Sequence, residues 1–301
     1  MRIRKGLWIN QSHEKMKDVI KLCAFADEAS AATAGQIEAL TQNAIPYLEI
    51  RGVNGQNIAA LDTVSAKAFA KELKDHGLAV WSIGSPAGKS QISEDFSKEK
   101  EQFARLLEMA AIFEAPCIRL FSFYGTDGSD VYFDEVCRRL DIFCDMAKAS
   151  GVRPCHENEK GIYGDTSERC LRLHRALPDL SAVFDPANFV QCGQDIMTAW
   201  EMLSPYVWYG HIKDALEDGR IVPPGRGIGA LREYLPLFAA MARDGKNSGV
   251  LTLEPHLMEF VGLAALENPD DKSVVGGLSY PDARAAFDHA TACLKDIISS
   301  I

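Results

Sequence analysis

The chain has 301 residues, of which 47% are hydrophobic and 25% charged, a composition typical of a soluble globular protein that can bury a large core. Its formal net charge is −10, because 42 Asp and Glu outnumber 32 Lys and Arg. This acidity argues against a nucleic-acid partner, since phosphate binding depends on Lys and Arg.

No apolar run approaches the roughly 18–20 residues of a membrane helix, and the amino-terminal segment has no apolar run of signal-peptide length. We therefore expect a cytoplasmic protein with no membrane partner. The eight cysteines are scattered and form no CxxC pair, which favours buried, reduced thiols over a cysteine metal site.

Hydrophobic periodicity predicts eight strand–helix units after an irregular extension over residues 1–20. Strands are expected at 21–25, 45–52, 78–86, 115–125, 152–159, 180–186, 207–214 and 249–256. Helices are expected at 31–43, 64–77, 94–114, 131–151, 167–177, 194–203, 228–245 and 281–301. Gly77 is expected just past the end of its helix, Thr166 or Ser167 as an N-cap, and Pro281 near the first turn of the last helix.

Regular alternation of strands and helices predicts an α/β fold with a parallel sheet, and eight units in this length predict a (β/α)8 TIM barrel. We expect one domain over residues 1–301, because no low-complexity linker divides the chain. An open doubly wound sheet is the alternative. It loses support because no GxGxxG follows the first strand and no P-loop is present.

The last four predicted strands each end on a residue that can bind a metal: Glu157, Asp185, His211 and Glu254. Taken singly, each has an ordinary alternative, such as a helix cap, a salt bridge, a buried histidine or a turn residue before proline. In a barrel, however, these strand ends converge on one pocket, where unpaired carboxylates repel and lose hydration. A divalent cation removes that cost, and mixed oxygen and nitrogen ligands suit Mn²⁺, Mg²⁺, Zn²⁺ or Co²⁺.

The motifs YLEIR, HENEKGIYGDT, VFDPAN, HIKDA and LTLEPH together resemble the sugar phosphate isomerase/epimerase superfamily, the xylose isomerase-like TIM barrels, over about residues 23–298. The resemblance implies that the four strand-end residues bind one divalent metal. It also implies that Glu157 and Glu254 are the catalytic acid and base on opposite faces of a small sugar or sugar phosphate. The implied reaction removes a proton next to a carbonyl through an enediolate that the metal stabilises.

Strand parity adds candidates for substrate contact, each with a structural ion pair as its alternative: Glu159, Lys213, His256, Glu49 and Arg51. Parity turns His156 and Asn158 toward the helices instead. Asn188 stands where many relatives have a histidine, and it can hydrogen-bond but is a poor metal ligand. Arg226, in a glycine-rich loop, either binds a substrate anion or lies in an exposed turn. The long segment 258–280 predicts a lid over the site.

Three other activities remain open at this stage. A dehydratase or lyase of an inosose-like or dehydroshikimate-like substrate begins with the same proton abstraction. A ligand-binding barrel without turnover is a second alternative. DNA-repair endonucleases of the same superfamily need several histidines and a basic face, which a charge of −10 disfavours.

The 3-epimerase branch carries an arginine soon after the strand-seven histidine, and IKDALED lacks it, which disfavours that activity. Barrels of this family often form dimers or tetramers, and nothing in the sequence marks an interface.

Overall fold

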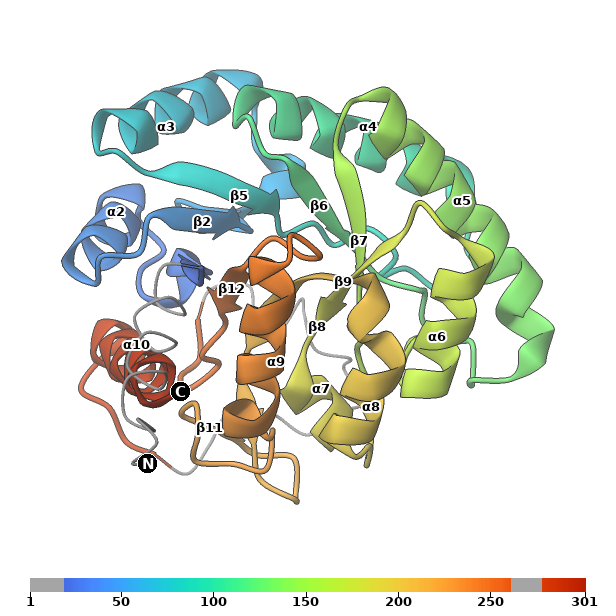
Figure 1. Cartoon of the computed structure of the whole chain (residues 1–301). Coiled ribbons are helices and arrows are strands. Elements are labelled where there is room, and N and C mark those ends of the chain that lie inside the picture. The colour runs from blue at the N-terminus through green and yellow to red at the C-terminus, as the bar shows by residue number, and fades with distance from the viewer. Residues whose placement is uncertain (1–18, 261–277) are drawn as a thin grey trace, which may run out of the picture.

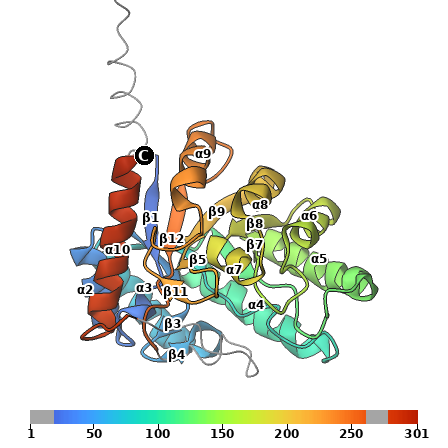
Figure 2. The same cartoon turned by 90° about the horizontal axis from the view of Figure 1, so that it is seen from below.

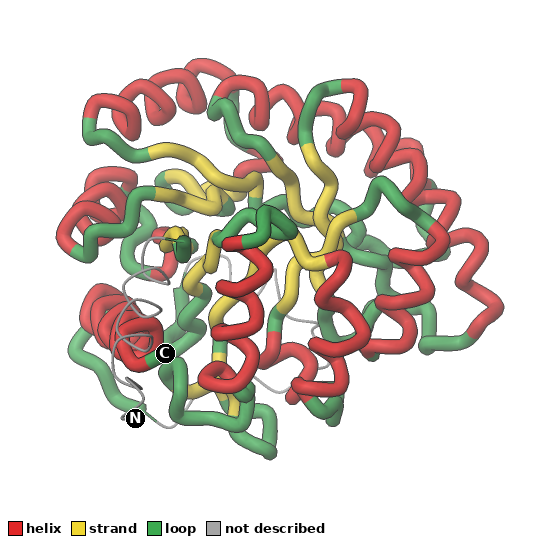
Figure 3. The backbone as a smooth tube through the Cα atoms, viewed as in Figure 1, coloured by secondary structure: helices red, strands yellow, loops and turns green. Residues whose placement is uncertain are grey.

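The computed structural model describes residues 19–260 and 278–301, and its centre is a closed barrel of parallel strands ringed by helices (Figures 1 and 3). Going round the barrel, the strands follow the order of the chain, and β12 pairs back with β1. The predicted (β/α)8 fold is therefore confirmed. The barrel strands are β1 Lys21–Ala24, β2 Tyr47–Ile50, β5 Ala79–Ile83, β6 Cys117–Leu120, β7 Arg153–Glu157, β8 Ser181–Phe184, β9 Val207–Ile212 and β12 Val250–Leu253.

The helices that cover the barrel lie where the sequence predicted them, with one addition. They are α2 Thr33–Gln42, α3 Thr63–Asp75, α4 Phe96–Ile112, α5 Phe133–Ala149, α6 Ser167–Ala176, α7 Pro186–Gln191, α8 Ile196–Leu203, α9 Leu231–Arg243 and α10 Ala283–Ser300. The addition is α7, which begins directly after β8 because Asp185 caps it and Pro186 occupies its first turn. Pro281 does not enter the last helix, because Asp282 is the N-cap and the proline precedes it.

Helix α3 illustrates how local sequence sets these elements. Asp62 Oδ1 accepts hydrogen bonds from the amides of Val64 and Ser65, which satisfies donors that the first turn leaves without partners. Phe69 and Leu73 then recur at helical spacing and are buried against the barrel, each contributing about 1.5–3 kcal/mol. The helix ends at the predicted position, where Gly77 takes φ of +70°.

The barrel interior below the strand ends is packed rather than hollow. Cys23, Cys117 and Cys155 form a buried cluster there with Tyr209 and neighbouring valines. All eight cysteines of the chain are unpaired, five of them buried and three half-buried. Because the lower interior is filled, a ligand can reach the barrel axis only from the carboxyl ends of the strands.

Two short hairpins extend from the carboxyl ends of the strands. Gly52–Val53 (β3) pairs with Gln56–Asn57 (β4), and Asp214–Ala215 (β10) pairs with Ile221–Val222 (β11). In the side view of Figure 2 both hairpins lie on the side of the molecule opposite the C-terminal end of α10. The predicted lid falls largely on residues 261–277, which lie outside the described residues. Within the part that is described, no helix is both long and apolar enough to cross a bilayer.

Candidate functional site

The four strand-end residues meet at one point near the barrel axis. One ligand atom from each of them lies within 4.8 Å of the ligand atoms of the other three. Two ligands of the same divalent ion, each at about 2.0–2.5 Å, are separated by at most ~5 Å, so this spacing suits a shared ion. All four side chains are buried: Glu157, Asp185, His211 and Glu254.

Glu157, at the end of β7, is held by three side chains. Arg119 Nη1 lies 3.1 Å from its Oε2, while Asn188 Nδ2 lies 3.2 Å and His211 Nδ1 3.1 Å from its Oε1. Burial alone raises the pKa of Glu157, but His211 and Arg119 together outweigh it and lower the pKa to about 2. The carboxylate is therefore ionised at neutral pH.

Glu254, just after β12, has more cationic neighbours. Its Oε1 lies 3.0 Å from Arg51 Nη1 and 3.3 Å from His256 Nε2, and its Oε2 lies 3.2 Å from Lys213 Nζ. Burial opposes ionisation, yet Lys213 and His256 hold the pKa of Glu254 well below its usual range. Arg51 in turn pairs with Asp27 and Glu28 of the 3₁₀ turn Ala26–Glu28 at 3.0 and 3.1 Å.

Asp185 both caps α7 and faces the centre. Its Oδ1 accepts from the Asn188 amide at 3.0 Å, and Asn158 clamps its backbone, donating to the carbonyl at 2.8 Å and accepting from the amide at 3.0 Å. Its Oδ2 is buried and makes no hydrogen bond to the described residues, only an ion pair of 3.1 Å with Lys213 Nζ. Burial raises the pKa of Asp185 to about 6, against the opposing Lys213 ammonium.

His211 of β9 is oriented from its far side. Its Nδ1 faces Glu157 and Glu254, whereas its Nε2 lies 3.1 Å from Oε2 of Glu49, whose other oxygen accepts from Tyr209 Oη at 2.9 Å. Burial lowers the pKa of His211, but Glu157 and Glu49 outweigh burial and raise it well above its usual range. A carboxylate on the far nitrogen is the arrangement that commonly orients a metal-binding histidine.

These side chains fit a divalent cation. They offer three carboxylates and one imidazole. The buried Asp185 Oδ2 makes no hydrogen bond to the described residues, and a bound ion would supply the partner that it lacks. Hard oxygen and borderline nitrogen donors of this kind suit Mn²⁺, Mg²⁺, Zn²⁺ or Co²⁺.

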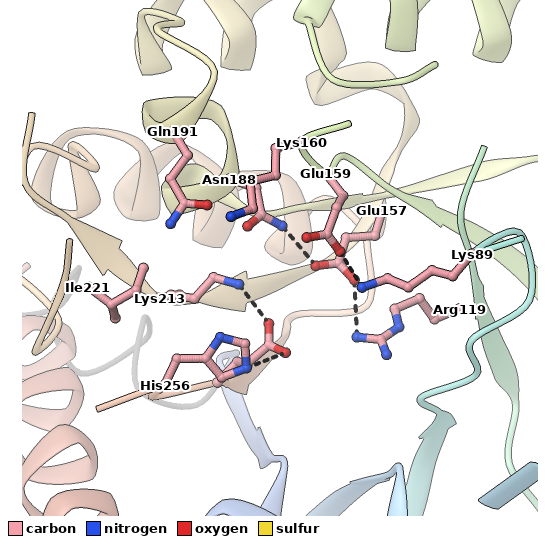
Figure 4. Close-up of a pocket in the computed structure, with 11 residues that line it drawn as sticks. Lys89, Arg119, Glu157, Glu159, Lys160, Asn188, Gln191, Lys213, Ile221 and His256 are labelled. Atoms are coloured by element: carbon pink, nitrogen blue, oxygen red, sulfur yellow. Dashed lines mark hydrogen bonds and ion pairs between the residues drawn. The ribbon is translucent and has the colours of Figure 1, made fainter. Parts of the chain in front are cut away.

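A pocket of about 450 Å³, including its open mouth, leads to this centre (Figure 4). Among the predicted substrate contacts, Glu159, Lys213, Asn188 and His256 line it. Glu49 and Arg51 are not among its described lining residues, because Glu49 lies beneath His211 and Arg51 lies behind Glu254. Their contacts fit the structural ion-pair alternative, in which they position the residues that face the pocket.

A family model described as "Xylose isomerase-like TIM barrel" matches residues 37–275. The chain belongs to this family. This match confirms the resemblance that the sequence motifs carried, and the closed parallel barrel agrees with it.

Solved structures with the same fold include enzymes of different activities. D-psicose 3-epimerase from Clostridium cellulolyticum H10, with D-tagatose, has 16% identity and a TM-score of 0.68, with 92% of this chain and 98% of that chain covered. The probable 3-DHS dehydratase AsbF from Bacillus anthracis has 19% identity and a TM-score of 0.64, with 92% and 97% covered. An IolI protein with a bound zinc atom has 16% identity and a TM-score of 0.66, with 93% and 99% covered. No curated protein matches the sequence. Identities this low show the fold alone.

Five pocket residues of this xylose isomerase-like barrel were not predicted from the sequence: Lys89, Arg119, Lys160, Gln191 and Ile221. Arg119 had a visible signal, because a charged residue inside the apolar strand CIRL is costly to bury without a partner. The other four lie in loops, in the short strand β11 or at the end of the unpredicted α7, and the sequence offers no comparable signal for them. His156, by contrast, packs against His174 of α6 as its parity predicted.

Asp214, in β10, organises the glycine-rich loop that follows β11. Its two carboxylate oxygens accept hydrogen bonds of 2.8–3.0 Å from the amides of Ala215, Gly225, Gly227 and Gly229. A Cβ on Gly227 would approach the Ala215 carbonyl oxygen to 2.2 Å, so only glycine fits there. Ile221, which pairs with Ala215 in the hairpin before this loop, lines the pocket. Arg226 is exposed and is not among the described lining residues, as its exposed-turn alternative predicts.

Proposed function

We propose that the protein is a divalent-metal-dependent isomerase or epimerase of a small sugar or sugar derivative, and that it removes a proton next to a carbonyl. One observation carries the proposal. Of the four residues that meet at the centre, Glu157 and Glu254 also line the pocket, whereas Asp185 and His211 are not among its described lining residues. Two carboxylates that share one centre and face one cavity are placed to exchange protons with the same ligand.

Glu157, Asp185, His211 and Glu254 would hold the metal ion, which when bound polarises the substrate carbonyl and stabilises the negative charge that develops beside it. His211 and Arg119 keep Glu157 ionised, and Lys213 and His256 keep Glu254 ionised, so that either glutamate can accept a proton at neutral pH.

The same cations disfavour the protonated carboxyl, so a proton taken up by one glutamate is readily returned to the substrate. Lys213 Nζ, within 3.2 Å of both Asp185 and Glu254, is a fixed positive charge at the wall of the pocket. Such a charge favours an anionic transition state over a neutral substrate.

The test is an exchange experiment in deuterated water with Mn²⁺-loaded protein and a panel of keto and aldo sugars and their phosphates. Solvent deuterium that enters at a carbon next to the carbonyl, detected by NMR, supports the proposal. A product that is lighter than the substrate by one water molecule would instead identify the protein as a dehydratase. Binding of a sugar without deuterium exchange would identify it as a ligand-binding barrel.

Metal dependence is tested in the same assay. Chelation should abolish exchange, and added Mn²⁺ should restore it. Elemental analysis of the purified protein gives an independent readout, and a protein that neither carries nor takes up a divalent ion would contradict the proposal.

A further inference from the structure

The pocket has an outer wall that the proposed chemistry does not use. We call Lys89, Glu159, Lys160 and Gln191 the outer wall. They come from the loops after β5 and β7 and from the end of α7. In Figure 4, Glu159 and Lys160 lie between Lys89 at one end and Gln191 at the other, with His256 on the opposite side of the pocket. A side of the pocket with three charged side chains of its own requires a physical reason, since charges are costly to withdraw from water.

The charges that face the pocket are unequal. The described lining residues include four cations, Lys89, Arg119, Lys160 and Lys213, and three carboxylates, Glu157, Glu159 and Glu254. In the proposed function two of those carboxylates and Asp185 hold the metal, which itself brings two positive charges, so that six positive charges face four carboxylates. Glu159 then remains as the only other carboxylate among the described lining residues. Among the described residues of the pocket, positive charge is therefore in excess, which favours an anion.

Lys89 is held rigidly at this position. Gly88 donates its amide to Glu99 Oε1 at 2.7 Å, and Ser90 Oγ donates to Glu99 Oε2 at 2.6 Å, so one buried carboxylate holds both neighbours of Lys89. Gly88 has φ of +87°, and a Cβ there would lie 2.0 Å from the Phe121 carbonyl oxygen. The loop therefore packs against the chain after β6 more closely than any other residue would allow.

The lysine side chain is also fixed at its tip. Lys89 Nζ lies 2.7 Å from Glu159 Oε2 and 4.4 Å from the centre of the Phe121 ring, and the side chain is only 8% exposed. A charged group that is pre-positioned in this way loses little conformational entropy when it meets a ligand.

The loop that carries Glu159 and Lys160 is tied to the same rim. Tyr163 donates its amide to the Ser122 carbonyl at 3.2 Å, and the Gly164 amide donates to Ser122 Oγ at 2.8 Å. The loops after β5, β6 and β7 thus form one connected rim that presents both lysines to the pocket.

We propose that the outer wall is a subsite for an anionic group of the substrate, a carboxylate or a phosphate, at the end away from the reacting carbonyl. The enzyme would then act on a sugar acid or a sugar phosphate in preference to a neutral sugar. The identity of the reacting end rests on the proposed function, but anion binding at the wall can be tested without turnover.

The experiment measures equilibrium binding of three ligands that lack a carbonyl and so cannot react: sorbitol, sorbitol 6-phosphate and gluconate. Calorimetry on the Mn²⁺-loaded protein should give at least about tenfold tighter binding of one or both anions than of sorbitol, and added salt should weaken this preference. The tighter of the two anions identifies phosphate or carboxylate as the group that the wall takes.

Two variants locate the preference. Lys89→Met and Lys160→Met should each weaken binding of the preferred anion by about five- to tenfold while leaving sorbitol binding unchanged. Lys246→Met is the matched control, because Lys246 pairs with Asp244 on the surface before β12, at the opposite end of the barrel, and should change neither. The double variant Lys89→Met/Glu159→Gln removes the ion pair without leaving an unpaired charge. It replaces Lys89→Met if that variant does not fold, and it should lose the preference for the anion to the same extent.

Equal affinity for all three ligands would overturn the proposal. So would a preference that survives both lysine substitutions, since the anion would then bind at the metal. Either result would leave the proposed function standing, because deuterium exchange tests it independently. Absence of deuterium exchange together with a retained preference for the anion would contradict the proposed function and not the anion subsite.

Discussion

The two glutamates that face the pocket are each paired with a buried arginine, yet the two pairs differ. Arg119 lies within ion-pair distance of Glu157 and, among the described residues, of no other carboxylate, and its buried Nε makes no hydrogen bond to them. Arg51 is shared between Glu254, Asp27 and Glu28. One side of the site is a simple pair, and the other is a network.

The difference separates two tasks that a charged pair can perform. On the Glu157 side, Arg119 lines the pocket, so it can act on a ligand as well as on its partner. On the Glu254 side, Arg51 links the 3₁₀ turn after β1 to Glu254 at the end of β12. These are the two strands whose pairing closes the barrel. We therefore expect Arg119 to contribute to the chemistry of the site and Arg51 to contribute more to the stability of the fold.

The largest expected effect is on turnover. Glu157→Gln and Glu254→Gln should each lower the exchange rate by about 10²–10⁴-fold, because each removes a proton acceptor and a ligand while keeping the side-chain volume. Deuterium incorporation measured for both variants checks this. Exchange within a factor of two of wild type in either variant would contradict the assigned role.

Unfolding in urea should separate the same two variants. Glu157→Gln leaves Arg119 without a carboxylate partner within ion-pair distance among the described residues, whereas Glu254→Gln leaves Arg51 with Asp27 and Glu28. We expect the greater loss of stability for Glu157→Gln.

Replacing the arginines reverses that order. Arg51→Met would leave three buried carboxylates facing one another and should cost about 3–5 kcal/mol in the free energy of unfolding. Arg119→Met leaves Glu157 with Asn188 and His211 and should cost about 1–3 kcal/mol. Urea titrations of both proteins at pH 7 test the ranking, and equal losses would show that the network and the simple pair are equivalent.

A smaller effect concerns His211, which contacts both glutamates. Glu49→Gln keeps the shape of the support behind this histidine but removes its charge, and should weaken Mn²⁺ affinity by about 10–100-fold. Tyr209→Phe removes only the hydrogen bond to Glu49 and is the milder companion variant. Metal titration by calorimetry measures both. Unchanged affinity in Glu49→Gln would mean that His211 needs no support from β2.

The last prediction concerns how the stability of the fold depends on pH through His174, which lies outside the site. His174 of α6 lies away from both pairs, and burial lowers its pKa to about 4. As pH falls below 6.5, the unfolded chain binds a proton at this residue and the folded protein does not, so stability should fall by about 2 kcal/mol at pH 5. His174→Gln should remove that part of the loss in urea unfolding at pH 7 and pH 5. An identical pH dependence in the variant would show that other groups cause it.

The sequence was sufficient for the centre of the site but not for its rim. Glu157, Asp185, His211 and Glu254 could be predicted because a residue at the end of a barrel strand has its direction set by alternation and its location by the closed sheet. Lys89 could not, since its place depends on a loop that folds back onto the chain after β6 through long-range hydrogen bonds. Helix α7 was missed because a six-residue helix leaves little periodicity to detect.

The loop around Asp214 has a consequence for how this barrel can diversify. Because one carboxylate holds three glycine amides at once, residues 225–229 act as a single unit in which an insertion or a side chain at Gly227 would displace the rest. Substitutions that change the substrate should therefore be tolerated at Ile221, whose side chain lines the cavity, and not at Gly227, where a side chain would displace the loop.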